Sequence, residues 1–165
     1  MPQTIVLTGI PEYPPEKIGS EAITPGHLVE IVPSGGDAGQ LRKHATASGD
    51  AAPYFALESL VPSLSNSQTA PIDLAYATDS SVRWAIGRNG NMFYAWVPAS
   101  ATAIKDGDEL TSNGDGTLKK YVAQATNEGG TATYTIAVRA VVARAAEDVD
   151  NSGGGSAARI RVRVV

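Results

Sequence analysis

The C-terminal part of the chain alternates strictly between charged and aliphatic residues. The run consists of Arg159, Ile160, Arg161, Val162, Arg163 and Val164. A period of two places successive side chains on opposite faces of a β-strand, so the aliphatic set is expected in the core. The arginine face predicts either a solvated edge strand, whose charges discourage aggregation, or a row that binds carboxylates of a partner.

Residues 104–121 carry the clearest hairpin pattern in the chain. Strand-like residues at both ends flank a centre rich in Gly, Asn and Asp. Gly107, Gly114 and Gly116 can adopt positive φ without a steric clash, which tight turns require. The pattern therefore predicts two antiparallel strands joined by a turn.

Shorter runs of apolar residues predict further strands at residues 27–32, 41–45, 72–76, 82–87 and 92–97. Asn89-Gly90, the pair favoured in a type I′ turn, would join the last two runs into a second hairpin.

Three further segments are less regular. Residues 54–60 fit a strand or a single helical turn. Residues 134–145 predict one long central strand, because their Val, Ile, Tyr and Thr content outweighs the Ala and Arg that would favour a helix. Residues 147–156 are acidic and then rich in Gly and Ser, which predicts a mobile loop.

The first 24 residues predict an extended N-terminal arm. Ile5 and Leu7 alternate with polar or smaller neighbours and could add a strand to a sheet, whereas Pro11, Pro14 and Pro15 interrupt any regular ladder. We expect this arm to make few contacts of its own and to pair with the body or with a neighbouring molecule. A frayed terminus is the alternative.

Composition narrows the class of protein. A length of 165 residues, 42% apolar and 18% charged, suits one folded domain, and we assign residues 25–165 to it. The many short strands predict an all-β fold, a small β-barrel or β-sandwich. A net charge of −4 argues against non-specific nucleic-acid binding. The chain contains no cysteine, no apolar run of membrane-spanning length and no secretion signal, so we expect a cytosolic product without membrane partners.

Candidate chemistry is sparse. The spacing of the histidines His27 and His44 fits no metal or catalytic motif, and hydrogen-bonded or surface histidines are expected. The acidic residues of 106–115 fail the spacing of a calcium loop. We therefore expect no catalytic, cofactor or metal site and no enzymatic activity. The aromatic residues Trp84, Tyr94 and Trp96 favour core packing, with an exposed sugar-binding face as the alternative.

Several of these segments together resemble the head decoration (capsid cement) proteins of tailed bacteriophages. The similar segments lie between residues 27 and 165: Lys43-His44-Ala45-Thr46-Ala47, Ala52-Pro53-Tyr54-Phe55-Ala56-Leu57-Glu58, Ile104-x-x-Gly107-Asp108-x-Leu110, the turn at 114–116, and Arg159-Ile160-Arg161-Val162-Arg163. Proteins of this family are small, rich in β-structure and usually trimeric, so the resemblance implies a β-tulip-like body for this chain. The family's proteins bind the outside of the expanded capsid and reinforce the joints between capsomers.

The resemblance implies a structural virion protein without enzymatic activity, a homotrimer whose partner is the major capsid protein. It also implies an arm that reaches the capsid or a neighbouring subunit. We expect Arg159, Arg161, Arg163, Ile5 and Leu7 to contribute to the partner interface. The alternative is a β-sandwich module of a phage tail or fibre that binds carbohydrate or a cell surface.

Overall fold

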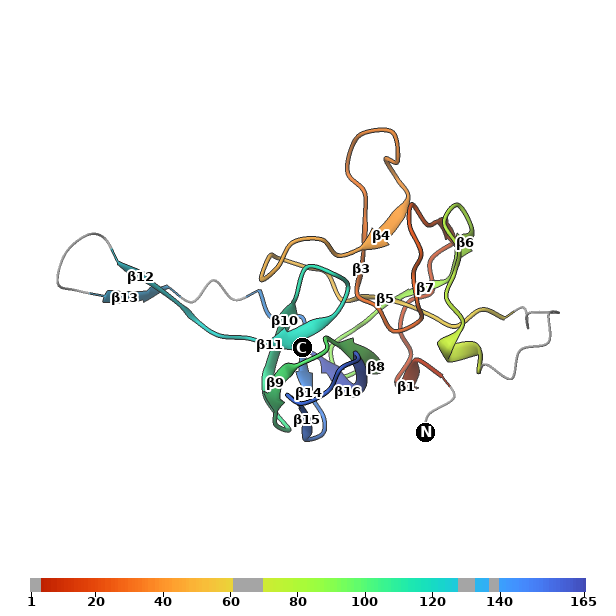
Figure 1. Ribbon diagram of the computed structural model, residues 1–165. Helices are drawn as coiled ribbons and strands as arrows, with labels where there is room; N and C mark the ends of the chain where they lie inside the picture. The colour runs from red at the N-terminus through yellow and green to blue at the C-terminus, as the bar shows by residue number, and fades with distance from the viewer. Residues whose placement is uncertain (1–3, 61–69, 128–132, 137–139) are drawn as a thin grey trace.

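The computed structural model of the protein describes residues 4–60, 70–127, 133–136 and 140–165 (Figure 1). This part of the chain is all-β, as the sequence predicts: it has strands and one short 3₁₀ turn, η1 (Pro71–Asp73), and no α-helix. It consequently has no helix that is long and apolar enough to cross a membrane. None of its sheets closes into a barrel.

The strands are short and occur along the whole chain. Their bounds are β1 (Val6–Thr8), β2 (Lys17–Ile18), β3 (Val29–Ile31), β4 (Leu41–Lys43), β5 (Tyr54–Ala56), β6 (Ser81–Val82), β7 (Trp84–Ile86), β8 (Met92–Val97), β9 (Ala101–Ile104), β10 (Glu109–Ser112), β11 (Leu118–Lys120), β12 (Gln124–Asn127), β13 (Thr133–Ile136), β14 (Ala143–Ala145), β15 (Val149–Asn151) and β16 (Ala158–Val164).

The largest sheet has the order β1-β8-β16-β14-β10-β11. β16 lies in its interior and pairs antiparallel with β8 on one side and β14 on the other. The predicted alternation along this strand is confirmed, because Ile160, Val162 and Val164 are buried while Arg161 and Arg163 are exposed. The predicted solvated edge strand is wrong, because both backbone edges of β16 are occupied by neighbouring strands.

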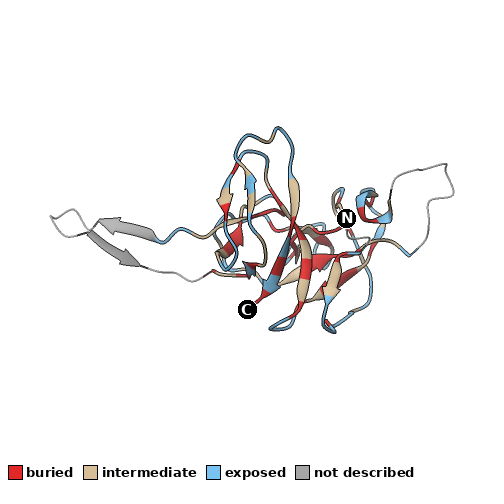
Figure 2. Cartoon of the chain, turned by 90° about the horizontal axis from the view of Figure 1, so that it is seen from below, coloured by how far each residue is buried: buried red, intermediate tan, exposed pale blue. Residues whose placement is uncertain are grey.

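The main core lies on the aliphatic face of this sheet. Phe93 of β8 stacks on Phe55 of β5, with ring centroids 4.6 Å apart, and neither side chain is accessible to solvent. β5 pairs with β7, so this contact joins two separate sheets. A second cluster forms beside it from Ile23, Val29, Leu41, Ala56, Tyr76, Val82 and Trp84. Figure 2 shows buried residues in the strands and in several connections, and exposed ones mainly in the connections.

The hairpin predicted within residues 104–121 is confirmed. β10 and β11 pair antiparallel, with Ser112 opposite Leu118. Gly114 and Gly116 have φ values of 90° and 82° in the connecting turn. A Cβ on Gly116 would lie only 2.8 Å from the Lys43 side chain, so glycine is needed both for the conformation and for close packing.

The predicted hairpin of 82–87 with 92–97 is wrong. β7 pairs with β5, whereas β8 pairs with β16 and β1. The turn between them exists, because the Asn91 amide donates to the Arg88 carbonyl at 2.9 Å, but of its two central residues only Gly90 has a positive φ. A type I′ turn needs a positive φ at both central residues, so this turn does not form the predicted hairpin. The chain instead leaves one sheet and enters another here.

Other segments also depart from the predictions. Residues 71–73 form η1, where a strand over 72–76 was expected. The single strand expected over 134–145 is divided into β13 and β14, which belong to different sheets, and residues 137–139 lie outside the described residues. The expected loop 147–156 contains β15, which pairs with β9. Residues 54–60 contain the strand β5.

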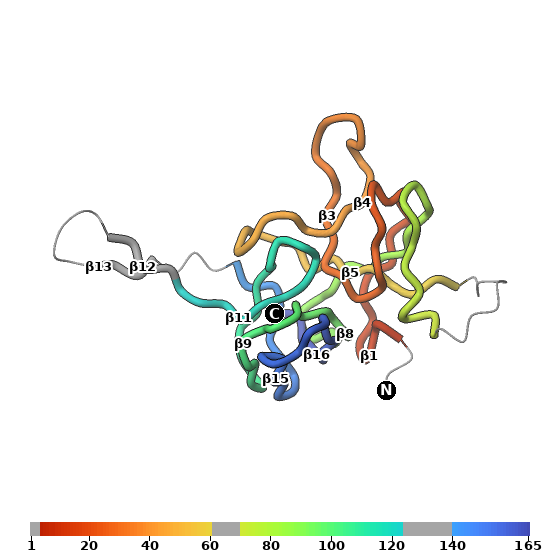
Figure 3. Tube along the Cα trace, viewed as in Figure 1, coloured from red at the N-terminus to blue at the C-terminus, as the bar shows by residue number. Residues whose placement is uncertain are grey.

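The N-terminal segment is extended but is part of the body over its described residues, 4–24. β1 pairs with β8, β2 pairs with β6, and the backbone of Glu12 forms an isolated antiparallel β-bridge with that of Ile86. Ile5 lies in the main core and Ile23 in the second cluster, both inaccessible to solvent. The expectation of few contacts is therefore wrong. Figure 3 shows this segment running beside the chain around β6.

This packing predicts that the N-terminal segment stabilises the fold. Replacing Ile5, which is 0% exposed, with alanine should lower the free energy of unfolding by about 2–5 kcal/mol, because it leaves a cavity in the core. Ile10→Ala is the matched control, since Ile10 is 84% exposed on the same segment and should change stability by less than about 0.5 kcal/mol. Denaturant unfolding of both variants provides the measurement. Equal stability of the two would show that the segment does not pack against the core.

Candidate interaction surface

The outer face of the six-stranded sheet carries two parallel rows of large side chains. One row is the arginines of β16, and the other is contributed by β8. The cross-strand pairs are Arg159 with Trp96, Arg161 with Tyr94, and Arg163 with Met92. Directly opposed residues share one face of a sheet, so these six side chains form the surface that we call the arginine face. Arg, Trp, Tyr and Met are also the residue types enriched at protein interfaces.

Arg159 is used within the fold. Its side chain is only 7% exposed, and its guanidinium lies 4.0 Å from the centroid of the Trp96 ring. It donates to the Asp73 carboxylate at 2.5 Å, to the Pro25 carbonyl at 3.1 Å and to the Ile72 carbonyl. These bonds attach η1 and the turn at Pro25 to the sheet. Arg159 therefore is not available to a partner in this conformation.

Arg161 is exposed but already has an acidic partner. Its Nε donates to Glu147 at 2.8 Å, and its backbone amide donates to the other oxygen of the same carboxylate at 2.7 Å. Glu147 thus neutralises the Arg161 guanidinium and also accepts the hydrogen bond of the Arg161 backbone amide. The pair occupies the middle of the arginine face.

Arg163 is the only one of the three without a hydrogen bond or ion pair to any described residue. Its direct neighbour on β14 is Arg144, a second positive charge at an opposed position. Arg144 donates to Glu109 at 3.1 Å. Both arginines line a cleft of about 540 Å³, to which Asn89, Asp106 and the C-terminal valines also contribute.

The two N-terminal residues expected at a partner interface differ in accessibility. Ile5 is completely buried in the main core, so it cannot contact a partner without unfolding of the segment. Leu7 lies in β1, at the edge of the six-stranded sheet, and is half-buried. Of the five interface residues predicted from the sequence, the structure therefore leaves Leu7, Arg161 and Arg163 accessible.

The aromatic residues do not form one exposed platform. Trp84 is 4% exposed and packs edge-to-face against Tyr54 in the second cluster. Trp96 donates its indole N–H to the Pro25 carbonyl at 2.8 Å, and Arg159 covers its ring. Since stacking of a sugar requires an open ring face, these two residues favour the core-packing prediction.

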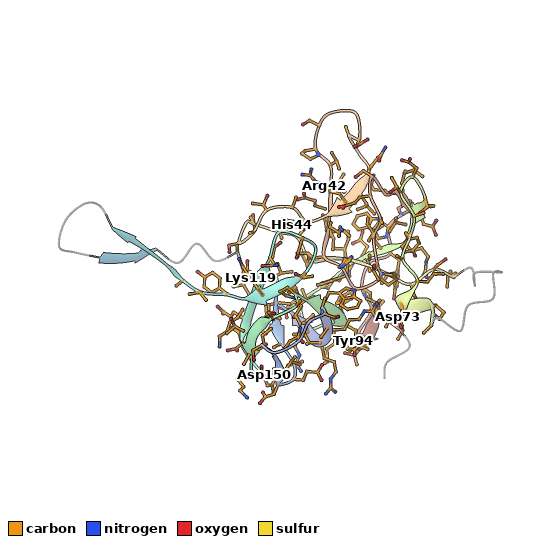
Figure 4. All side chains as sticks on the ribbon, in the orientation of Figure 1. Arg42, His44, Asp73, Tyr94, Lys119 and Asp150 are labelled. Carbon is orange, nitrogen blue, oxygen red and sulfur yellow. The ribbon has the colours of Figure 1, made fainter. Side chains whose placement is uncertain are left out.

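The structure brings together a serine and a histidine that the sequence analysis did not connect. The hydroxyl of Ser112 lies 2.8 Å from Nδ1 of His44 and accepts the amide of Gly114 at 3.1 Å. Nε2 of His44 donates to the Asp50 carbonyl at 3.2 Å and lies 3.6 Å from Glu30. Figure 4 shows His44 between Arg42 and Lys119.

This contact resembles a nucleophile–base–acid series only in composition. Ser112 is 0% exposed and His44 is 3% exposed, so no substrate reaches the hydroxyl in this conformation. The bonds instead connect the β10–β11 hairpin with β3 and β4. The two residues are 68 positions apart in the sequence, which explains why sequence spacing gave no signal.

His27 is hydrogen-bonded, in agreement with expectation, and its environment makes it a poor base. Nδ1 accepts the amide of Thr24 at 3.1 Å, and the ring lies 6.0 Å from that of Trp96. Burial, assisted by the positive charge of Lys43, lowers the pKa of His27 from 6.5 to about 4. The imidazole is therefore neutral at physiological pH.

The acidic residues around 106–115 are used in turns and ion pairs. Lys120 binds Asp108 at 2.7 Å, and its hydrogen bond lowers the pKa of that carboxyl. Asp115 accepts the amide of Thr117 within the hairpin turn. No group of three His, Asp or Glu side chains in the described part of the chain is arranged to bind a metal ion.

A second candidate element is the β12–β13 hairpin. The two strands pair over four positions and form a sheet of their own. Figure 1 shows them standing away from the rest of the molecule. A two-stranded hairpin without further packing is marginally stable in water, and its outer edges offer unpaired backbone groups. Such an element is typical of a segment that is completed by a partner.

Comparison with models of known protein families and with curated protein sequences finds no match to this chain. Its function must therefore be inferred from its surface and its architecture.

The geometry predicts that the three arginines differ in their effect on stability. Arg159→Gln should lower the free energy of unfolding by about 1–3 kcal/mol, because it removes the contact with Trp96 and the donor to the Ile72 carbonyl. Arg161→Gln is the matched control on the same face and should cost about 1 kcal/mol or less, because its ion pair is exposed to solvent. Thermal or denaturant unfolding of the two variants checks this. Equal effects would contradict the structural role of Arg159.

The lowered pKa of His27 predicts a specific dependence of stability on pH. The unfolded chain binds a proton at His27 near pH 6.5, whereas the folded protein does so only near pH 4. The free energy of unfolding should therefore be largest above pH 6.5 and fall as the pH decreases towards 4, by up to about 3 kcal/mol from this group.

The variant His27→Asn isolates this contribution. The Asn carbonyl oxygen can still accept the Thr24 amide, but the side chain does not titrate. Denaturant unfolding at several pH values between 4 and 7 should show a smaller loss for His27→Asn than for the unmodified protein. Parallel losses in both proteins would mean that other groups cause the pH dependence.

Proposed function

We propose that this protein is a structural virion protein that binds the outer surface of a phage capsid and stabilises it. It is made in the host cytoplasm and acts on the capsid exterior, with the major capsid protein as its partner. The observation that carries the proposal is the separate β12–β13 hairpin, a described element paired only within itself. The resemblance of residues 27–165 to head decoration proteins supports the same role.

The rest of the described structure agrees with a binding role. The one serine–histidine contact found is buried, and the charged side chains of the hairpin turns are used in local hydrogen bonds. At its Arg163 end, in contrast, the arginine face is exposed and lines a cleft, and arginine is a residue type that recurs at interfaces. Non-enzymatic attachment is the function that these features favour.

We take the body to be a small β-sandwich of the β-tulip kind, which assembles as a homotrimer. The stack of Phe55 on Phe93 supports two layers, since the two residues belong to different sheets. Trimerisation would give β12–β13 a neighbour on which to pack, because closed symmetry brings the same elements of several copies together.

The alternative, a module of a phage tail or fibre that binds carbohydrate or a cell surface, has less support. The indole ring of Trp96 is covered by Arg159, and Trp84 is buried. Neither ring offers the open face on which a sugar stacks.

The proposal is tested by adding the purified protein to expanded capsids assembled without it. The protein should co-sediment with the capsids, saturate at a defined number of copies and raise the temperature at which the capsids open. Replacing residues 124–139 with a short Gly-Ser linker should leave the melting of the free protein nearly unchanged and weaken attachment strongly. A protein that does not bind capsids but is retained by glycans would favour the alternative.

A further inference from the structure

The most informative unexplained feature is the cleft beside Arg144 and Arg163. These residues occupy directly opposed positions on β14 and β16, where like charges repel each other and destabilise the sheet. Residue pairs of this kind are tolerated when an anion lies between them or beside them. Arg144 has Glu109 as a partner, but Arg163 has none among the described residues.

The neighbouring arginines show that the lack of a partner is specific to Arg163. All three arginines of β16 lie on one strand and one face. Arg159 is neutralised by Asp73 and Arg161 by Glu147. The described residues supply a carboxylate for each of the first two positions and none for the third, at the point where the surface is hollowed into a cleft of about 540 Å³.

The chemistry of the cleft is asymmetric. Arg144 and Arg163 provide two planar guanidinium groups, each suited to bind a carboxylate through two hydrogen bonds. Asp106 also lines the cleft and makes it unfavourable for a simple multivalent anion. An occupant with one carboxylate directed at the arginines and a hydrogen-bond donor directed at Asp106 fits both sides.

We propose that this cleft binds an acidic side chain, Asp or Glu, of a peptide segment belonging to the protein to which this chain attaches. Arg163 forms the principal ion pair, and Arg144 adds a second donor while it keeps its bond to Glu109. The site itself rests on the geometry of the cleft, whereas the identity of the partner as a capsid protein rests on the proposed function.

The first experiment tests the site without a capsid. The side-chain Nε–H signals of the arginines are followed by NMR while a blocked Gly-Glu-Gly peptide is added, which offers one carboxylate and backbone N–H donors, with blocked Gly-Gln-Gly as the control. The signals of Arg163 and Arg144 should shift in a saturable manner, and that of Arg161, which is bound to Glu147, should shift little. Equal shifts of all arginines, or no shift at millimolar peptide, would overturn the site.

The second experiment measures attachment to capsids. Arg163→Gln should weaken binding about tenfold or more, because it removes a charge-assisted pair of hydrogen bonds. Arg161→Gln, the matched control, should stay within about twofold, since its charge is already satisfied within the chain. Arg163→Lys keeps the charge but not the planar guanidinium, so its affinity for capsids should lie between those of the two glutamine variants. Binding of the unmodified protein should weaken with salt, and binding of Arg163→Gln should depend on salt less.

Control measurements distinguish a failure of this inference from a failure of the proposed function. Arg163→Gln should melt at the same temperature as the unmodified protein or slightly higher, because the repulsion from Arg144 is removed. Unchanged attachment of this variant to capsids would overturn the inference and leave the proposed function standing. Absence of attachment by the unmodified protein would overturn the proposed function, and the peptide titration would still decide the site. If the variant changes only the oligomeric state, the cleft binds another copy of this chain, which overturns the assignment to an external partner.

Discussion

Pairing of β16 with strands on both of its edges is the constraint on which the rest of the structure depends. A strand paired on both sides cannot slip by one residue without moving Ile160, Val162 and Val164 out of the core. This fixed register determines which residues of β8 and β14 lie opposite each arginine. The contacts of the arginine face and the opposition of Arg144 and Arg163 follow from it.

The same register gives three identical residue types three different roles. Arg159 is buried against Trp96 and joins η1 and the turn at Pro25 to the sheet. Arg161 is exposed but paired with Glu147, and Arg163 lies beside a cleft with no acidic partner among the described residues. The three sites differ in the distance from the arginine to an acid and in its exposure to water, and these determine whether the charge stabilises the fold or is available for binding.

If the protein attaches as proposed, stability and attachment depend on different parts of the molecule. The N-terminal segment contributes Ile5 and Ile23 to the two apolar clusters, so it belongs to the folded body. The β12–β13 hairpin pairs within itself, and the cleft beside Arg163 lies at the end of the six-stranded sheet. A hairpin that pairs only within itself could adapt to a partner without disturbing the other sheets, and a rigid sheet can hold an ion pair in fixed geometry.

The sequence by itself determined the all-β class, the alternation of β16 and the β10–β11 hairpin, because each of these depends on residues close together in the chain. Period-two patterning and the positive φ of Gly114 and Gly116 are local properties. Beyond that hairpin, tertiary structure alone decided which strands pair. Asn89-Gly90 predicted a hairpin, yet β7 and β8 belong to different sheets. It also decided which acid each arginine binds. Asp73 lies 86 residues from Arg159 in the sequence, whereas Glu147 lies 14 from Arg161. Alternation in one strand says which side chains share a face, but only the assembled sheets determine what each of them meets there.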